Sequence, residues 1–357
     1  MPPPRDDEFL AQLVQRGRLG VESARELAAR VAAGEALDPL LEAALGVDAK
    51  DVARLRRTRA GEIPEIPGFD VRERIGTGGT ADVWRALDRR EGREIALKVL
   101  RHEVARDERA LAAFVNEAKL LRRIEHDGVV RCFGVARAGD VYFTRLELID
   151  GPSLQEELDR GRTFGEDEAF AIVLGVARSL AHLAELGLVH RDVKPGNVLV
   201  ASDGRPVLID LGFAAAAGEE NFADSAIGTV AYLSPEQARG GARADIRSDV
   251  YSLGVSMFQL VVGRLPFVAA DDREVLALQV LASLESPELK RRGISPHLHY
   301  FVQKTMSKDP EHRYQSWNEL ITDVERLLEG RAGIDWRAGE KPSPRAAARR
   351  ARRRRRP

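Results

Sequence analysis

The stretch HRDVKPGNVLV, residues 190 to 200, concentrates more reactive chemistry than any other part of the chain. Its polar half supplies a carboxylate at Asp192, a cation at Lys194 and an amide at Asn197, and an apolar run follows at once. An aspartate can accept a hydroxyl proton, a lysine can neutralise a transferring phosphoryl group, and an asparagine oxygen can bind magnesium. A polar turn before a strand is the alternative interpretation, but a match of this length favours phosphate chemistry.

A second carboxylate follows in LIDLG, residues 208 to 212. Its Asp210 lies 18 residues after Asp192 and is a candidate ligand for magnesium bridging two phosphates. An Asp-x-Gly sequence alone is a common turn. The spacing from Asp192 is what favours the metal-binding interpretation.

Upstream, GTGGTADV spans Gly76 to Val83 between two expected strands. This context argues against a dinucleotide-binding turn, which would open a helix, and favours a hairpin that covers phosphates. Glycines allow the backbone to approach phosphates closely and to turn its N–H groups onto them. Ala81 occupies the place of the usual third glycine, and a flexible hairpin without a ligand is the alternative.

Lys98 ends the apolar segment IALK and could direct its ammonium group at the α- and β-phosphates of a nucleotide. A solvated edge lysine is the alternative. Glu117 borders the apolar stripe of an expected helix, three residues from Phe114 and from Leu120, and is a candidate partner for Lys98. Most glutamates on amphipathic helices are merely exposed, so spacing leaves this role open.

Taken together and in this order, these motifs resemble the eukaryotic-like protein kinases, especially the bacterial serine/threonine group, over residues 69 to 328. The resemblance implies an α+β, two-lobed protein kinase fold, with a small sheet-rich lobe before a larger helical lobe. It implies ATP and Mg²⁺ as cofactors and protein serine or threonine hydroxyls, including the chain's own, as acceptors in signalling. Implied roles are catalysis for Asp192 and Lys194, metal binding for Asn197 and Asp210, and nucleotide binding for Ile75, Gly76, Thr77, Gly78, Gly79, Val83, Ala96, Lys98, Glu117, Leu146, Glu147, Leu148 and Ile149.

The resemblance also implies two supporting contacts. Glu236 would pair with Arg313, and Asp249 would brace the catalytic loop from a buried helix. Leu146 would be the gatekeeper at the start of an adenine-binding hinge that runs to Gly151. The chain departs from the family pattern in three residues that leave the catalytic groups in place: Ser234 before Pro235, Leu211 after Asp210, and Arg145 before Leu146.

Arg191 precedes the catalytic aspartate and is a candidate for binding a phosphate placed on the segment between Asp210 and Glu236. Ser225 is the first candidate for that modification and Thr229 the second. An ordinary loop hydroxyl at Ser225 and a structural contact to the catalytic loop at Thr229 are the alternatives.

Periodicity divides the chain into a helical module at 1–60, a linker rich in proline and glycine at 61–68, a kinase domain at 69–329 and a basic tail at 330–357. Within the domain we expect four strands, a helix at 106–124 between the third and the fourth, and then mainly helices. The module shows nothing catalytic, so a docking role and a merely structural role both stay open. The expected strands cover residues 70–76, 82–88, 94–100 and 141–148.

Composition fits a globular protein with a sizeable core, since 44% of residues are hydrophobic and 31% are charged. One cysteine, Cys132, excludes an internal disulfide, and no signal peptide or long apolar run is present, so we expect a cytoplasmic protein without a membrane span. The formal charge of −1 includes nine basic residues and no acidic residue at 341–357. We expect this tail to be disordered alone, and either to bind an anionic partner or simply to be solvated.

Two other classes of function remain at this point. A scaffold that binds nucleotide without turnover would be expected to lack Lys98, Asp192, Asn197 or Asp210, and all four are present. A nucleic-acid or membrane binder would act through the basic tail. Deleting 341–357 separates the last class from a kinase, which would keep phosphoryl transfer to a generic substrate. The sequence is silent on the physiological substrate and on oligomeric state.

Overall fold

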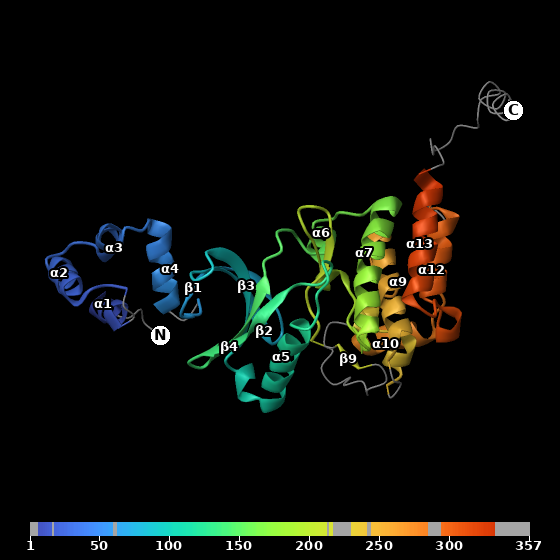
Figure 1. The fold of residues 1–357 in the computed structure, drawn as a ribbon, viewed down its shortest axis with the longest axis horizontal. Coiled ribbons are helices and arrows are strands. Elements are labelled where there is room, and N and C mark those ends of the chain that lie inside the picture. The colour runs from blue at the N-terminus through green and yellow to red at the C-terminus, as the bar shows by residue number, and fades with distance from the viewer. Residues whose placement is uncertain are drawn as a thin grey trace, which may run out of the picture. The chain divides into compact units, whose positions relative to one another are not determined.

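The computed structural model describes residues 6–15, 18–59, 63–212, 214–216, 230–240, 244–284 and 294–332 (Figure 1). The chain forms two compact units. The first unit contains residues 1–123 and 131–148, and the second contains residues 124–130 and 149–357. Each unit is described by itself below.

The first unit begins with short helices that have a hydrophobic core of their own. They are α1 (Asp6–Gln15), α2 (Val21–Ala32), α3 (Leu37–Leu45) and α4 (Ala49–Arg59). Phe9, Leu13 and Leu41 are fully buried in this core, as their helical spacing predicts. Gly46 ends α3 with a φ of 66°, a left-handed conformation that glycine adopts without a Cβ penalty. The helical module expected from the sequence is therefore present.

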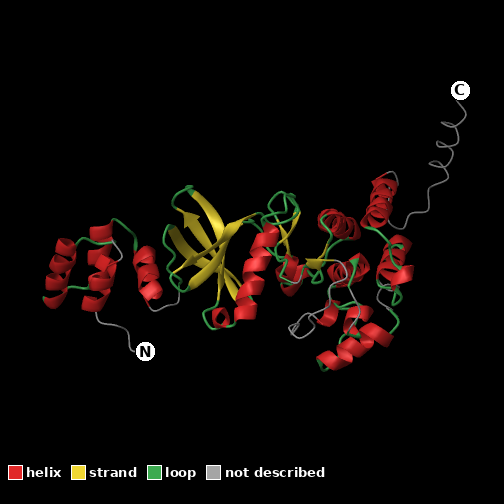
Figure 2. Cartoon of the chain, turned by 60° about the horizontal axis from the view of Figure 1, so that its bottom comes forward, coloured by secondary structure: helices red, strands yellow, loops and turns green. Residues whose placement is uncertain are grey.

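The first unit also contains a five-stranded antiparallel sheet with the order β1-β2-β3-β5-β4 (Figure 2). Its strands are β1 (Phe69–Thr77), β2 (Ala81–Asp88), β3 (Arg93–Leu100), β4 (Cys132–Ala138) and β5 (Val141–Glu147). The expected strands agree with β1, β2, β3 and β5 to within about one residue at most ends. Strand β4 was not expected from the sequence, because a register shift between Cys132 and Gly134 interrupts its alternation of apolar and polar residues.

One face of this sheet, called here the outer face, carries a core of large apolar side chains. Trp84, Leu97 and Phe143 belong to this core, and so do Ile63 and Ile66, which precede β1. Ile63 and Ile66 are only 4% and 2% exposed. The proline-rich segment before β1 is therefore packed against the sheet and contributes to its stability.

Replacing Ile66 by alanine should lower the free energy of unfolding of the first unit by about 2–5 kcal/mol, because a fully buried isoleucine leaves a cavity. Chemical denaturation of the purified protein measures this change. Ile75→Ala is the matched control, since Ile75 is 43% exposed on the same sheet and its truncation should change stability little. Equal stability of the Ile66→Ala variant and the wild type would show that the segment does not pack on the sheet.

Helix α5 (Glu108–Leu121) follows the short 3-10 helix η1 (Val104–Arg106). Asp107 caps α5, because its side chain accepts hydrogen bonds from the backbone N–H groups of Arg109 and Ala110. Phe114 packs with Ala81 and Leu100 in a second small core. This packing fixes the rotation of the helix and hence the direction of Glu117, three residues further on.

The second unit is mainly helical. Its helices are α6 (Leu154–Asp159), α7 (Glu166–Glu185), α8 (Pro235–Ala238), α9 (Ile246–Val262), α10 (Asp272–Leu281), α12 (Pro296–Thr305) and α13 (Trp317–Ala332), with 3-10 turns η2 (Pro195–Asn197), η4 (Val230–Tyr232) and η5 (Pro310–His312). Helix α9 packs against α7 and α12 and is buried along almost its whole length (Figure 1). None of the helices described in either unit has the length and apolar character needed to cross a bilayer.

Two short antiparallel strand pairs of the second unit position its polar loops. Strand β6 (Leu188–Val189) pairs with β9 (Ala215–Ala216), and β7 (Val198–Val200) pairs with β8 (Pro206–Leu208). The motif at 190–200 lies between β6 and the end of β7, and Asp210 follows β8 by two residues. The pairing of β7 with β8 therefore brings the two motifs to one end of the same hairpin.

Candidate functional site

In the first unit, the sheet brings several predicted nucleotide-binding residues onto one face. Val83 lies opposite Lys98 on neighbouring strands, and Ala96 lies opposite Leu146. Because side chains alternate along a strand, these four residues share the face opposite the outer face. Ile75 lies on the edge strand β1 and is 43% exposed.

The glycine-rich hairpin joins β1 to β2. Gly76 pairs with Val83, Thr77 pairs with Asp82, and the N–H of Gly78 donates to the carbonyl of Ala81 at 2.9 Å. None of Gly76, Gly78 and Gly79 has a positive φ. A Cβ built on Gly78 would lie 3.2 Å from the Ala81 oxygen, and one on Gly79 would meet nothing within 4 Å. These glycines therefore provide bare backbone surface and not unusual dihedral angles.

The contact expected between Lys98 and Glu117 is present. The Nζ atom of Lys98 lies 2.7 Å and 2.9 Å from the two carboxylate oxygens of Glu117. The side chains are only 15% and 8% exposed, so the ion pair is largely shielded from water. Such a pair fixes the direction of the lysine ammonium group beside the sheet face.

The predicted hinge begins at the end of β5. Leu146 is buried, and the N–H of Glu147 donates to the Arg131 carbonyl at 2.8 Å. Leu148 ends the first unit, and Ile149 begins the second. In the second unit, a Cβ on Gly151 would lie 1.8 Å from the Val200 carbonyl oxygen, so only glycine fits there.

In the second unit, the predicted catalytic residues are joined by hydrogen bonds. The carboxylate of Asp192 lies 2.7 Å from Nζ of Lys194, and it accepts a hydrogen bond from Nδ2 of Asn197 at 2.9 Å. The same Nδ2 donates to the Asp192 carbonyl at 2.8 Å. Asn197 thus uses its amide nitrogen to hold Asp192, which leaves its amide oxygen as the atom suited to a metal.

A backbone hydrogen bond of the preceding residue, Ile209, connects Asp210 to this group. The N–H of Ile209 donates to the carbonyl of Asn197 at 3.1 Å, and Oδ1 of Asp210 accepts the N–H of Gly212 at 2.8 Å. Asn197 and Asp210 therefore present oxygen ligands at one end of the β7–β8 hairpin. Oxygen donors are what Mg²⁺ binds, and it commonly uses only one or two protein carboxylates or amides together with substrate phosphates and water.

A buried carboxylate on α9, that of Asp249, binds the backbone of the catalytic loop. The oxygens of Asp249 accept the backbone N–H groups of His190 at 2.8 Å and Arg191 at 2.7 Å. Complete burial raises the pKa of Asp249 to about 7, and the two N–H donors act in the opposite direction. Arg191 has a φ of 68°, a costly conformation for a non-glycine residue that these bonds help to maintain. The bracing role expected for Asp249 is confirmed.

The pair expected between Glu236 and Arg313 is also present. Two nitrogens of Arg313 donate to the two carboxylate oxygens of Glu236 at 2.7 Å and 2.8 Å. The arginine side chain is 0% exposed, and its Nε also donates to the Ser307 carbonyl at 2.7 Å. Burial would raise the pKa of Glu236, but the Arg313 contacts outweigh burial and hold that pKa below its usual value.

The direction of Arg145, which the sequence left open, follows from the register of the sheet. Arg145 pairs with Leu97 and so lies on the outer face, away from Lys98 and Leu146. Its Nη2 donates to the Phe133 carbonyl at 3.0 Å. Two candidates for phosphorylation, Ser225 and Thr229, and the basic tail from 333 onward lie outside the described residues.

Sequence reasoning missed two charged residues at the glycine-rich hairpin, Asp82 and Arg101, which contact each other at 3.1 Å. The only signal in the sequence is that Asp82 lies inside the glycine motif, immediately before Val83. The pairing itself depends on the strand register.

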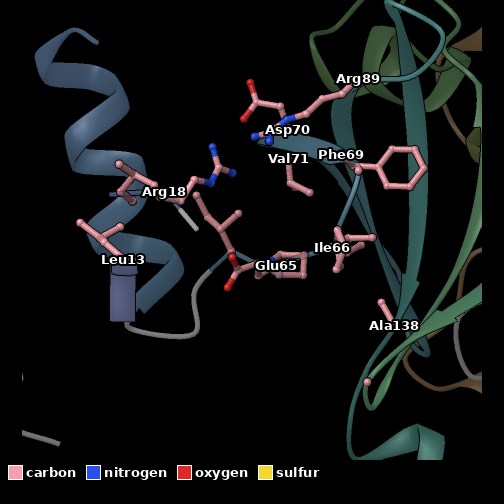
Figure 3. Close-up of a pocket in the computed structure, with 15 residues that line it drawn as sticks. Leu13, Arg18, Glu65, Ile66, Phe69, Asp70, Val71, Arg89 and Ala138 are labelled. Carbon is pink, nitrogen blue, oxygen red and sulfur yellow. The ribbon is translucent and has the colours of Figure 1, made fainter. Parts of the chain in front are cut away.

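The first unit also contains a cavity of about 560 Å³ between the helical module and the segment that leads into β1 (Figure 3). Leu13 and Arg18 line one side, and Ile66, Val71 and Ala138 line the other. None of the predicted nucleotide-binding residues lines it. The cavity is therefore separate from the sheet face that carries Lys98.

Comparison with known proteins gives the same assignment as the geometry. The family model for the protein kinase domain matches residues 69–324. The chain is 34% identical over 280 residues to the serine/threonine-protein kinase PknL of Mycobacterium tuberculosis, covering 78% of this chain and 69% of PknL. It is 33% identical over 265 residues to the serine/threonine-protein kinase PrkC of Bacillus subtilis, covering 73% of this chain and 40% of PrkC.

A third relative is the serine/threonine-protein kinase PknB of Mycobacterium leprae, 32% identical over 269 residues, with 73% of this chain and 43% of PknB covered. The chain thus spans about two fifths of the length of PrkC and PknB. The matched region contains the sheet, the hairpin, the Lys98–Glu117 pair and the Asp192 cluster. The chain belongs to the protein kinase domain family.

Proposed function

We propose that this chain transfers the γ-phosphoryl group of ATP to serine and threonine hydroxyls of protein substrates, itself included, as part of a signalling process. The observation that carries the proposal is the cluster in which Lys194 and Asn197 both hold the Asp192 carboxylate. The names of PknL, PrkC and PknB support the choice of serine and threonine as acceptors.

Nucleotide binding is assigned to the sheet face of the first unit. We propose that Ile75, Val83, Ala96 and Leu146 contact the adenine ring, and that the backbone of Glu147, Leu148 and Ile149 forms hydrogen bonds with its edge. Bare backbone at Gly76, Thr77, Gly78 and Gly79 would face the phosphates, and Lys98, directed by Glu117, would neutralise them. The exposed Ile75 and the shielded Lys98–Glu117 pair support this assignment.

Asn197 and Asp210 would hold Mg²⁺, which supplies positive charge against the β- and γ-phosphates when bound. Their oxygen donors at one end of a hairpin fit such an ion. Phosphoryl transfer asks little covalent chemistry of the protein, so the residues contribute by positioning and by charge. Asp192 would accept a hydrogen bond from the acceptor hydroxyl and orient it, and take its proton as the new bond to phosphorus forms. Lys194 would stabilise negative charge on the transferring group.

The test is a transfer assay with the purified 357-residue chain, ATP and a generic protein substrate, with and without magnesium. We expect phosphate on serine or threonine only when the metal is present, and loss of transfer when a chelator removes it. Phosphate on tyrosine alone would contradict the proposed acceptor class. Binding of ATP without transfer under any condition would favour a scaffold.

Replacing Glu117 by glutamine should lower kcat/KM for ATP about tenfold to a hundredfold, because Lys98 loses the charge that directs it and misplacement of a binding group is costly. Steady-state kinetics with varied ATP measure this. Glu108→Gln is the matched control, since Glu108 lies at the start of the same helix and is exposed. A wild-type kcat/KM for ATP in both variants would show that Glu117 is not needed to direct Lys98.

A further inference from the structure

Asp82 lies within the glycine motif but on the face of the sheet away from Lys98. It pairs with Thr77 on β1 and with Val99 on β3, and Val99 belongs to the outer-face core. The next residue, Val83, faces the other way and pairs with Lys98. A nucleotide on the Lys98 face would therefore not be touched by the Asp82 side chain.

The Asp82 carboxylate connects both strands of the hairpin to the end of β3. Its Oδ1 accepts a hydrogen bond from the Thr77 hydroxyl at 2.8 Å and from Nη2 of Arg101 at 3.1 Å. The backbone of Arg101 also contacts the hairpin, because its N–H donates to the carbonyl of Thr80 at 3.0 Å. The turn that should cover phosphates is thus fastened at Thr77, Thr80 and Asp82.

The environment of this pair is partly shielded. The Asp82 and Arg101 side chains are 20% and 31% exposed, whereas those of the highly exposed pair Arg137 and Asp140 are 56% and 81% exposed. Burial would raise the pKa of Asp82, but the hydrogen bonds from Arg101 and Thr77 outweigh burial and lower it. Asp82 is therefore held as a carboxylate, the form that best accepts both hydrogen bonds.

We propose that Asp82 and Arg101 act as a clasp that holds the glycine-rich hairpin in position from the outer face and thereby sets the affinity for nucleotide. Both are positioning residues. The clasp acts on nucleotide binding and not on the chemical step. It reduces the conformational freedom of the free hairpin, so that less entropy is lost when the hairpin closes on phosphates. Ala81, in the place of the usual third glycine, limits the same freedom at the start of β2. The inference rests on the proposed use of this hairpin for ATP.

The experiment compares Asp82→Ala, Arg101→Gln and the double variant with the wild type, at varied ATP with saturating protein substrate. We expect KM for ATP to rise about three- to tenfold in each single variant, as for loss of one charged hydrogen bond, while kcat changes less than about twofold. KM for ATP in the double variant should be no higher than in the single variant with the higher KM, because each single substitution already removes the Asp82–Arg101 contact. Asp82→Glu keeps the carboxylate and should restore most of the affinity.

Asp140→Ala is the matched control, since it breaks the exposed Arg137–Asp140 pair in the β4–β5 turn of the same sheet. It should leave KM unchanged. The clasp is overturned if Asp82→Ala binds ATP as well as the wild type, or if its KM shift is matched by Asp140→Ala. It is also overturned if kcat falls while KM stays constant.

A calorimetric measurement of magnesium–ATP affinity separates this inference from the proposed function. The same substitutions are compared in the Asp192→Asn background, because a measurement of affinity does not require turnover. A three- to tenfold loss of affinity there supports the clasp even if the wild type transfers no phosphate. Unchanged affinity there overturns the clasp even if the wild type is an active kinase.

Discussion

Replacing Asp192 by asparagine should lower the rate of phosphoryl transfer by about 10²- to 10⁴-fold, the range for loss of a general base. Asparagine has the same shape but cannot take a proton, and it removes the charge that lies 2.7 Å from Nζ of Lys194. The hydrogen bond from Nδ2 of Asn197 to the backbone carbonyl of Asp192 does not involve the Asp192 side chain and should remain. Single-turnover kinetics with saturating ATP isolate the chemical step.

The matched control is Asp203→Asn, an exposed aspartate in the turn between β7 and β8. This variant should retain wild-type transfer, and both variants should unfold at nearly the same temperature as the wild type. A loss of less than about tenfold in Asp192→Asn would contradict the role of Asp192 in accepting the proton.

Replacing Arg313 by methionine should lower the free energy of unfolding of the second unit by about 3–5 kcal/mol, the cost of leaving a buried charge without its partner. Arg313 is fully buried and donates to both oxygens of Glu236 and to the Ser307 carbonyl. Methionine fills part of the space but leaves the carboxylate uncompensated. Denaturant unfolding followed by circular dichroism measures the loss.

The same substitution should change how stability depends on pH. The pKa of Glu236 is lowered in the folded protein, so its stabilising effect is complete above the unfolded value of about 4.3 and is lost as pH falls through the folded value. Without Arg313, the largest influence that lowers the pKa of Glu236 is lost, and burial raises that pKa against the remaining hydrogen bond from the Ser248 hydroxyl. The difference in stability between wild type and Arg313→Met should therefore narrow as the pH falls from the raised pKa of Glu236 in the variant through its lowered pKa in the wild type.

Two variants complete this comparison. Glu236→Gln added to Arg313→Met should recover part of the lost stability, because no buried charge is left. Arg178→Met, which breaks the exposed Arg178–Glu325 pair, should cost about 1 kcal/mol or less. An Arg313→Met variant as stable as Arg178→Met would show that the buried pair does not stabilise the second unit.

The sequence was most informative where short-range chemistry determines structure. Short alternating or apolar segments predicted β1 and β2, and the amphipathic stripe with Phe114 predicted the helix that presents Glu117. The pairs Lys98–Glu117 and Glu236–Arg313 join residues 19 and 77 positions apart. The apolar stripe made Glu117 a candidate partner for Lys98 without deciding the contact, and the family resemblance supplied the Glu236–Arg313 pair.

Other features depend on register and burial, which periodicity does not determine. Strand β4 contains a register shift at Gly134, and its alternation is too weak to stand out. Ile63 and Ile66 lie among prolines and glycines, so their burial on the outer face was not evident. The Asp82–Arg101 contact and the direction of Arg145 both follow from which face of the sheet each residue occupies.

The most direct test of the kinase proposal is transfer of labelled γ-phosphate from ATP and magnesium to the protein itself and to a generic basic protein. Wild type and Asp192→Asn are compared, and the labelled amino acid is identified after hydrolysis. We predict label on serine or threonine in the wild type and none above background in Asp192→Asn. No label with the wild type, in conditions where calorimetry shows that ATP binds, would contradict the proposal and indicate a nucleotide-binding scaffold.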